Sequence, residues 1–207
     1  MLEILLAAVL AAAPAPTPRA PASAAAPREL RSLPPATWRI DVTHSELSFR
    51  IRHLVSRVQG TFRQWSGTLT SDSTDWASGA VQVTIQPASI FTDNERRDNH
   101  LRSADFFAAD SFPSITFQST RVTRTGDDLR IEGSLSIRGV TRPVVLTGTF
   151  TDFTRSAQGE QRVGFQATAR INRLDFGVAW NRAVEGGGVL LGDDVTIEIA
   201  IEAVRQP

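Results

Sequence analysis

Hydrophobic and polar residues alternate along most of the chain after Trp38. The alternation is found in the segments 47–51, 58–70, 81–86, 114–124, 129–138, 143–153, 163–171 and 195–201. Successive side chains of a β-strand point to opposite faces, so each segment predicts a strand with one apolar and one polar face. The pattern therefore predicts an all-β protein of eight strands.

Short turn signals separate several of these segments. Gly126-Asp127-Asp128, Arg138-Gly139-Val140 and Ala157-Gln158-Gly159 are typical of hairpins. Hairpins between consecutive strands predict an antiparallel up-and-down sheet. Such a sheet buries its apolar face and removes its edges by closing into a barrel, which is the fold we expect. A two-sheet sandwich is the alternative.

Two stretches do not alternate. Residues 92–107 contain no β-branched residue after Thr92, and Asp93 and Asn94 favour a helix start, so we expect a short helix near residues 93–104. Residues 174–192 hold five Gly and predict a long loop at the barrel mouth.

The N-terminal region differs from the rest because residues 1–36 are mostly Ala and Pro. The ten apolar residues 4–13 have the length of a signal-peptide core, and sites of A-x-A form follow. We therefore expect a signal peptide over 1–24, atypical because Glu3 stands where a positive charge is usual, and a linker over 25–36. The barrel is expected over 37–205, in a periplasmic protein. A disordered Ala/Pro tail on a cytoplasmic protein is the alternative.

Composition narrows the range of partners and chemistry. The 22 basic residues, all Arg, balance 22 acidic residues, so no general attraction to nucleic acid is expected. The absence of Cys excludes disulfides, thiolate nucleophiles and Cys-ligated metals. No apolar run approaches 18 residues, which predicts no transmembrane helix. The lack of Tyr argues against the aromatic girdles of an outer-membrane barrel.

Histidines offer the only candidate catalytic or metal chemistry. His44, His53 and His100, together with Asp98, would serve a metal- or histidine-dependent enzyme, which we keep as the alternative function. The odd spacing of His44 and His53 places them on opposite faces of one strand. Acyl transfer by Ser45 has little support because no G-x-S-x-G is present.

The apolar faces of the strands predict the lining of the barrel. The candidate ligand-binding residues of this interior are Phe49, Ile51, Val83, Ile85, Phe117, Leu135, Ile137, Phe165, Ala167, Ile171, Ile197 and Ile199. Gly133, Ala167 and Ala169 are small, which favours a cavity for a small molecule. A filled core that acts only through partners is the alternative.

Several segments together resemble the YceI-like family of periplasmic polyisoprenoid- or lipid-binding proteins. The resemblance covers about residues 37–204 and is carried by WRIDVTHSELSFRIRH (38–53), GTFRQWSGTL (60–69), SIFTDNERRDNHLRSADFF (89–107), FPSITF (112–117), GSLSIRGVTRPV (133–144), INRLDFG (171–177) and LGDDVTIEI (191–199).

The resemblance implies a lipocalin-like barrel that binds, transports or stores a long-chain lipid without catalysis or cofactor. Polyprenyl lipids, isoprenoid quinones and fatty amides are the ligand classes implied. The positions that match the motifs, candidates for head-group contacts or for holding the barrel end, are His44, Ser45, His53, Arg97, Asp98, His100, Asn172, Arg173, Phe176 and Gly177. A homodimer is plausible because two-fold pairing is the commonest oligomer.

Overall fold

The computed structural model describes residues 36–72, 75–156, 159–183 and 189–207. The expected signal peptide (1–24) and all but the last residue of the expected linker (25–36) lie outside these residues. The barrel begins at Ala36, one residue before its expected start, and its last strand ends at Arg205.

The strands and helices follow the alternation closely. Their bounds are β1 (Ala36–Ile40), β2 (Glu46–His53), β3 (Ser56–Phe62), β4 (Trp65–Asp72), β5 (Asp75–Ile85), η1 (Pro87–Ser89), β6 (Ile90–Phe91), α1 (Glu95–Arg102), β7 (Ile115–Thr125), β8 (Asp128–Ile137), β9 (Val140–Arg155), β10 (Gln161–Asn172), η2 (Arg173–Phe176) and β11 (Leu191–Arg205). All strand pairs are antiparallel.

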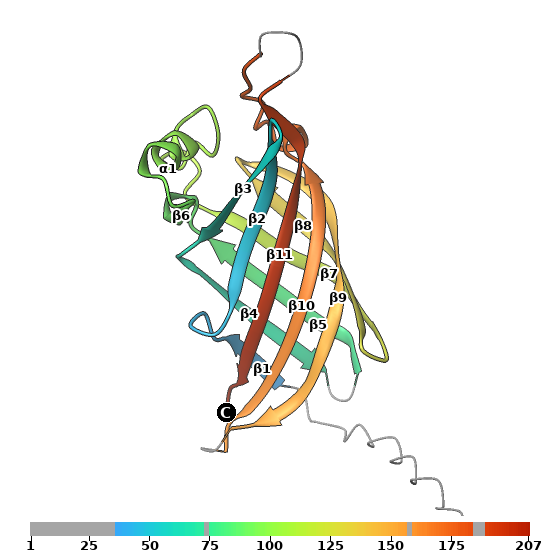
Figure 1. Cartoon of the computed structure of the whole chain (residues 1–207). Coiled ribbons are helices and arrows are strands. Elements are labelled where there is room, and N and C mark those ends of the chain that lie inside the picture. The colour runs from blue at the N-terminus through green and yellow to red at the C-terminus, as the bar shows by residue number, and fades with distance from the viewer. Residues whose placement is uncertain (1–35, 73–74, 157–158, 184–188) are drawn as a thin grey trace, which may run out of the picture. The chain divides into compact units, whose positions relative to one another are not determined.

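The sheet closes into a barrel, which confirms the predicted fold (Figure 1). Eight strands form the ring in the order β1-β4-β5-β7-β8-β9-β10-β11, and β1 pairs with β11 to close it. The edge of β11 that pairs with β1 pairs nearer its start with β2, which in turn pairs with β3. β3 and β4 are consecutive parts of the predicted strand 58–70, whereas β1 precedes the first predicted segment, 47–51.

The predicted inward faces are the buried ones. Along β8, Leu129, Ile131, Gly133, Leu135 and Ile137 are buried, while the residues between them are exposed or half-buried. β10 shows the same pattern. The apolar side chains of the ring therefore meet inside the barrel, where they remove their surface from water.

The predicted short helix is α1, which lies beside one end of the barrel (Figure 1). Its N-cap is Asn94, whose side chain accepts a hydrogen bond from the backbone N–H of Arg97 at 3.0 Å. The predicted loop, residues 174–192, contains most of η2. It ends slightly earlier than expected because β11 begins at Leu191. In the part of the chain that the structure describes, no helix has the length and hydropathy needed to cross a membrane.

Candidate ligand-binding site

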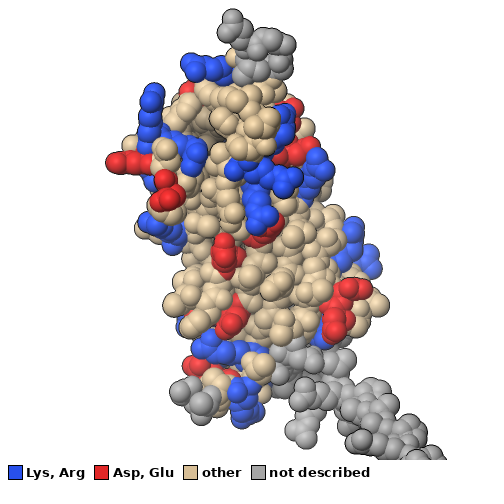
Figure 2. Space-filling model, in the orientation of Figure 1, with Lys and Arg blue, Asp and Glu red and all other residues tan. Residues whose placement is uncertain are grey.

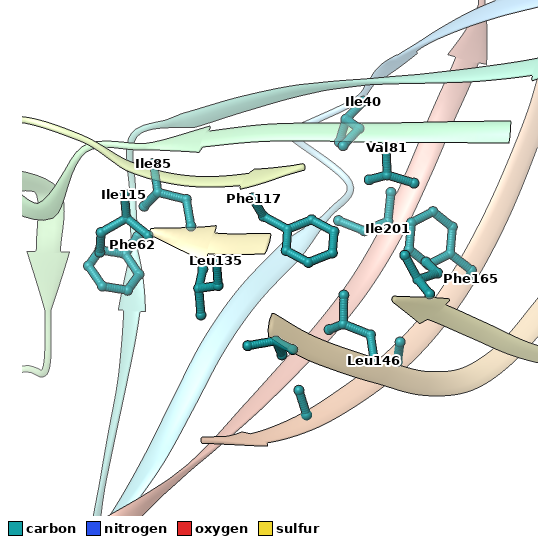
Figure 3. Close-up of a cluster of buried hydrophobic side chains, with 14 of the residues drawn as sticks. Ile40, Phe62, Val81, Ile85, Ile115, Phe117, Leu135, Leu146, Phe165 and Ile201 are labelled. Atoms are coloured by element: carbon teal, nitrogen blue, oxygen red, sulfur yellow. The ribbon is translucent and has the colours of Figure 1, made fainter. Parts of the chain in front are cut away.

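The barrel encloses a cavity of about 720 Å³ that is lined mainly by apolar side chains. Figure 3 shows part of this lining, with Phe117, Leu135 and Phe165 pointing from different strands into one interior. A cavity of this volume lies within the usual range of small-molecule sites. An eight-stranded barrel is wide enough for one such ligand.

Most of the predicted interior residues line this cavity. Those that do are Phe49, Ile51, Val83, Ile85, Phe117, Leu135, Ile137, Phe165, Ile171, Ile197 and Ile199. Ala167 does not line it, although it is buried at 3 % exposure. Ala167 packs closely against Gly148, its partner on β9. A Cβ atom at Gly148 would collide with the backbone of Gln166 and Ala167.

The small residues do not create the cavity in the way the sequence suggested. A Cβ at Gly133 would lie 2.5 Å from the Phe117 ring, so that ring already fills the space. Ile197 and Ile199 point inward and yet are only half-buried, because they border the empty volume. The cavity therefore arises where large side chains fail to meet across the barrel.

The end of the barrel at β1 is closed by packed side chains. Trp38 is fully buried, and its indole Nε1 donates a hydrogen bond to Ser71 Oγ at 3.3 Å. Leu69, Val163 and Ala203 are also buried in the core without lining the cavity. Among the described residues, packed side chains therefore fill the barrel between the cavity and this end.

The opposite end, near α1, carries the polar part of the lining. His53, Asn94, Arg96, Arg97, His100 and Arg173 are the polar residues of the cavity wall at this end. Asn94 and Arg96 are exposed to solvent as well as to the cavity. The cavity therefore opens here, and we call this end the open end and the β1 end the closed end.

A network around Thr92 fixes the N-terminal part of α1 at the open end. The carboxylate of the buried Asp98 accepts hydrogen bonds from the backbone N–H and the hydroxyl of Thr92, at 2.9 and 2.5 Å. Arg97 donates to the Thr92 hydroxyl and carbonyl oxygens at 2.7 and 2.6 Å. Asp98 thus has a structural role, whereas Arg97 is both anchored and part of the cavity wall.

His100 joins α1 to the loop that follows η2. Its ring stands edge-on to the rings of Trp180 and Phe106, with centroids 4.8 and 5.0 Å away. Its Nε2 lies 2.8 Å from a carboxylate oxygen of Asp105. All three rings line the cavity, so this aromatic cluster forms part of the wall at the open end.

Arg173 holds the loop that follows η2 through hydrogen bonds to its backbone. Its guanidinium is buried and donates to the carbonyl oxygens of Gly192, Val178 and Trp180, at 2.9, 2.5 and 2.9 Å. Burial lowers the pKa of Arg173, an effect that Asp193 opposes at 3.3 Å. Arg173 therefore positions Trp180 and is itself part of the cavity wall.

The remaining motif positions of η2 shape its ends. Asn172 accepts a hydrogen bond from the backbone N–H of Leu174 at 2.9 Å, and Gly177 adopts the left-handed conformation with φ of 72°. Phe176 is buried and lines the cavity. Asn172 and Gly177 thus form the turn that presents Arg173 and Phe176.

His44 and Ser45 lie at the closed end, away from the other motif residues. His44 Nδ1 is 2.9 Å from Asp41, and Arg162 donates to the same carboxylate at 3.0 Å. The His44 hydrogen bond, with Arg162, lowers the pKa of Asp41 to about 2 against the opposing effect of its burial. Ser45 exchanges hydrogen bonds with the Glu202 backbone. Both motif residues therefore secure the turn between β1 and β2.

The structure separates the residues of the alternative enzyme. His44 precedes β2 and His53 is its last residue, so the two histidines lie at opposite ends of this strand. The Asp98 carboxylate accepts its hydrogen bonds from Thr92. Among the described ranges, no three His, Asp or Glu side chains are grouped so that they could hold a metal ion. The described residues thus give no support to a metal-dependent enzyme.

Several residues of the open end were not predicted from the sequence to line the cavity. Trp180, Asn94 and Arg96 line the cavity, and their roles depend on where α1 and the η2 loop meet. A lone Trp in a Gly-rich loop was the available signal for Trp180. Phe106 and Phe107, which follow α1 in the chain, also line the cavity.

A closed antiparallel barrel with an apolar interior and one polar open end defines a lipocalin-like class of protein. A family model described as the YceI-like domain matches residues 38–203. The chain therefore belongs to the YceI-like family. Among curated proteins, UPF0312 protein SA2479 of Staphylococcus aureus strain N315 is 40 % identical over 164 residues, which are 78 % of this chain and 94 % of that protein.

Solved structures share the same fold. The Campylobacter jejuni YCEI protein has a TM-score of 0.66 and 29 % identity, covering 75 % of this chain and 90 % of that chain. Burkholderia cenocepacia BcnA has a TM-score of 0.67 and 23 % identity, covering 79 % and 98 %. A polyisoprenoid binding domain from Saccharophagus degradans has a TM-score of 0.62 and 15 % identity, covering 83 % and 99 %.

Proposed function

We propose that this protein binds one long-chain isoprenoid-type lipid in its barrel and carries or stores it without chemical change. The observation that carries the proposal is the cavity of about 720 Å³, which apart from Ser48 is apolar along the barrel and which has its charged lining residues at the open end. This distribution matches an amphiphile with a long apolar tail. The polyisoprenoid binding domain from Saccharophagus degradans, which shares the fold, supports the same class of ligand.

The energetics of such a site come from the tail. Each CH₂ transferred from water into an apolar cavity contributes about 0.8 kcal/mol. A chain that reaches from the open end toward Phe165 and Ile201 would bind tightly without any polar contact. Such a site discriminates by the length and width of the tail and accepts polyprenyl lipids, isoprenoid quinones or fatty amides.

The head group of the lipid belongs at the open end. His53 and Arg97 stand in the cavity wall there, and the exposed Arg96 borders the opening. Arg97 and Arg173 line the cavity, and their hydrogen bonds hold α1 and the loop that follows η2. A polar head would therefore meet these cations and the edge of solvent, and the closed end would hold only hydrocarbon.

A cavity-filling variant tests this proposal. Ile199 on β11 lines the cavity, and Ile199→Trp would displace at least two CH₂ groups of a bound tail. We expect the affinity for a dansyl-labelled geranylgeranyl amine, measured by fluorescence titration, to fall more than about tenfold. The matched control is Thr168→Trp, which places the same side chain at an exposed, outward-facing position of the neighbouring strand β10.

The control separates blockage from misfolding. Thr168→Trp should bind the probe like the wild-type protein, and both variants should unfold near the wild-type temperature. Unchanged probe affinity in a folded Ile199→Trp variant would contradict the proposal.

We also propose that the chain is exported and acts in the periplasm. The apolar segment 4–13 and the A-x-A sites after it support export. Fractionation of the native host followed by mass measurement of the protein tests this, and we expect a periplasmic form that lacks the first residues. A cytoplasmic full-length protein would contradict it.

A further inference from the structure

Exposed large hydrophobic side chains gather at the open end of the barrel. Among the described residues, the exposed large hydrophobics are Val42, Leu54, Val55, Val145, Leu174 and Val189. Leu54 and Val55 form the tip of the hairpin between β2 and β3, and Val55 is fully exposed. Leu174 and Val189 lie in the segment between β10 and β11, so four of the six share one end.

These side chains belong to neighbouring segments. The backbone N–H of Leu54 donates to the carbonyl oxygen of Leu190 at 2.9 Å, which places the hairpin tip against the residue that follows Val189. Leu174 follows Asn172, which pairs with Asp194 near the start of β11 (Figure 1). The four side chains thus surround the rim through which a lipid must enter.

Unpaired positive charge accompanies the exposed hydrophobics. Arg52 and Arg57 flank the hairpin tip, residues 52–57 contain no Asp or Glu, and Arg182 lies in the η2 loop. None of these three Arg has a carboxylate partner within 4 Å among the described residues. Figure 2 shows basic side chains around this end of the barrel.

The nearby acidic residues weaken this charge only in part. Asp193 and Asp194 are paired with Arg173 and Arg170. Asp175 adjoins Leu174, and α1 begins with Glu95, so positive charge is concentrated on the hairpin. Apolar side chains flanked by Arg without carboxylate partners have the composition of a surface that inserts into anionic lipid headgroups.

We propose that this surface, Leu54, Val55, Leu174 and Val189 with Arg52, Arg57 and Arg182, docks on an anionic phospholipid bilayer. The occupant is a bilayer because the apolar side chains lie in turns and loops next to Arg52, Arg57 and Arg182, whose charge complements an anionic headgroup surface. Docking places the open end on the membrane, so that a lipid tail enters the cavity without crossing water. The purpose of docking rests on the proposed function, whereas the docking itself does not.

Vesicle flotation with a hairpin variant tests the proposal. The double variant Leu54→Asn, Val55→Asn removes two exposed side chains, and Asn suits the positive φ of 52° at Leu54. The matched control is Val42→Asn in the turn before β2, at the closed end, where Val42 is 46 % exposed against 43 % for Leu54. The probes are vesicles of phosphatidylcholine alone and vesicles with a third of phosphatidylglycerol.

We expect the wild-type protein and Val42→Asn to bind the phosphatidylglycerol vesicles, and the double variant to bind at least about tenfold more weakly. Added salt should weaken wild-type binding because it screens the Arg charges. Absence of wild-type binding to either vesicle, equal losses in both variants, or retention by a protein partner in place of vesicles would overturn the proposal.

A second readout separates this inference from the proposed function. Titration with the dansyl-labelled geranylgeranyl amine in vesicle-free buffer should give the wild-type affinity for the double variant, because neither altered residue lines the cavity. Vesicle docking by a wild-type protein that takes up no probe would leave docking in place and contradict the proposed function alone.

Discussion

The two ends of the barrel differ in how the interior is occupied: side chains fill the closed end, whereas a cavity reaches the open end. At the closed end, Trp38 fills the interior, and Asp41, His44 and Arg162 tie the outer turn together. At the open end, the charged Arg97 and Arg173 border a cavity and are held by hydrogen bonds to backbone carbonyl oxygens. The comparison indicates that the packed closed end contributes most to the stability of the fold. The open end has polar residues in its wall, where a ligand would enter.

The largest expected effect comes from the closed end. Trp38→Ala empties a fully buried site, and we expect it to lower the free energy of unfolding by about 3–5 kcal/mol. Urea denaturation measures the change. Trp180→Ala at the open end is the comparison. Because this ring is only half-buried, its loss should lower the free energy of unfolding less than Trp38→Ala does, and should lower the affinity for the probe more. Equal stability losses in the two variants would remove the distinction between the ends.

The second effect concerns the guanidinium that holds the open end. Arg173→Gln leaves the carbonyl oxygens of Val178 and Trp180 without their donor, and we expect a stability loss of about 2–3 kcal/mol. Denaturation should be paired with titration of the dansyl-labelled probe, whose affinity should also fall because Trp180 loses its position. A loss of stability with unchanged probe affinity would show that Arg173 supports the fold and not the site.

The smallest effect depends on pH. The pKa of Asp41 is lowered to about 2 in the folded protein from an ordinary value of 3.8, so its pairing stabilises the fold above pH 4 and is lost as the pH falls toward 2. We expect Asp41→Asn to cost about 1 kcal/mol at pH 7, a value reduced for solvent screening at this surface position.

The pH profile provides the check. The difference between the wild-type protein and Asp41→Asn should shrink between pH 4 and pH 2, as measured by thermal unfolding. Asp127→Asn, which removes a highly exposed carboxylate, should change stability less than Asp41→Asn at pH 7. A difference that stays constant down to pH 2 would contradict the role given to Asp41.

The sequence predicted the fold because alternation directly reports which face of each strand is buried. Residues such as Phe49, Leu135 and Ile199 line the cavity for that reason. The volume of the cavity was harder to predict, because it depends on which side chains meet across the barrel. Gly133 suggested empty space, yet the Phe117 ring from the neighbouring strand occupies it.

The motif residues were divided by the structure for a similar reason. His44 and His100 both match the family's motifs, but one secures a turn at the closed end and the other packs against Trp180 at the open end. Local sequence does not state which end of a strand faces a cavity. That assignment required the pairing of β2 with β11 and the position of α1.

Native mass spectrometry of the protein purified from its own host, before and after organic extraction, tests the central claim most directly. The account predicts one lipid per chain, released by extraction and identified as an isoprenoid-type species, and rebinding of one geranylgeranyl lipid by the emptied protein. A bare chain that also takes up no added prenyl lipid would contradict the claim that the cavity is a lipid site.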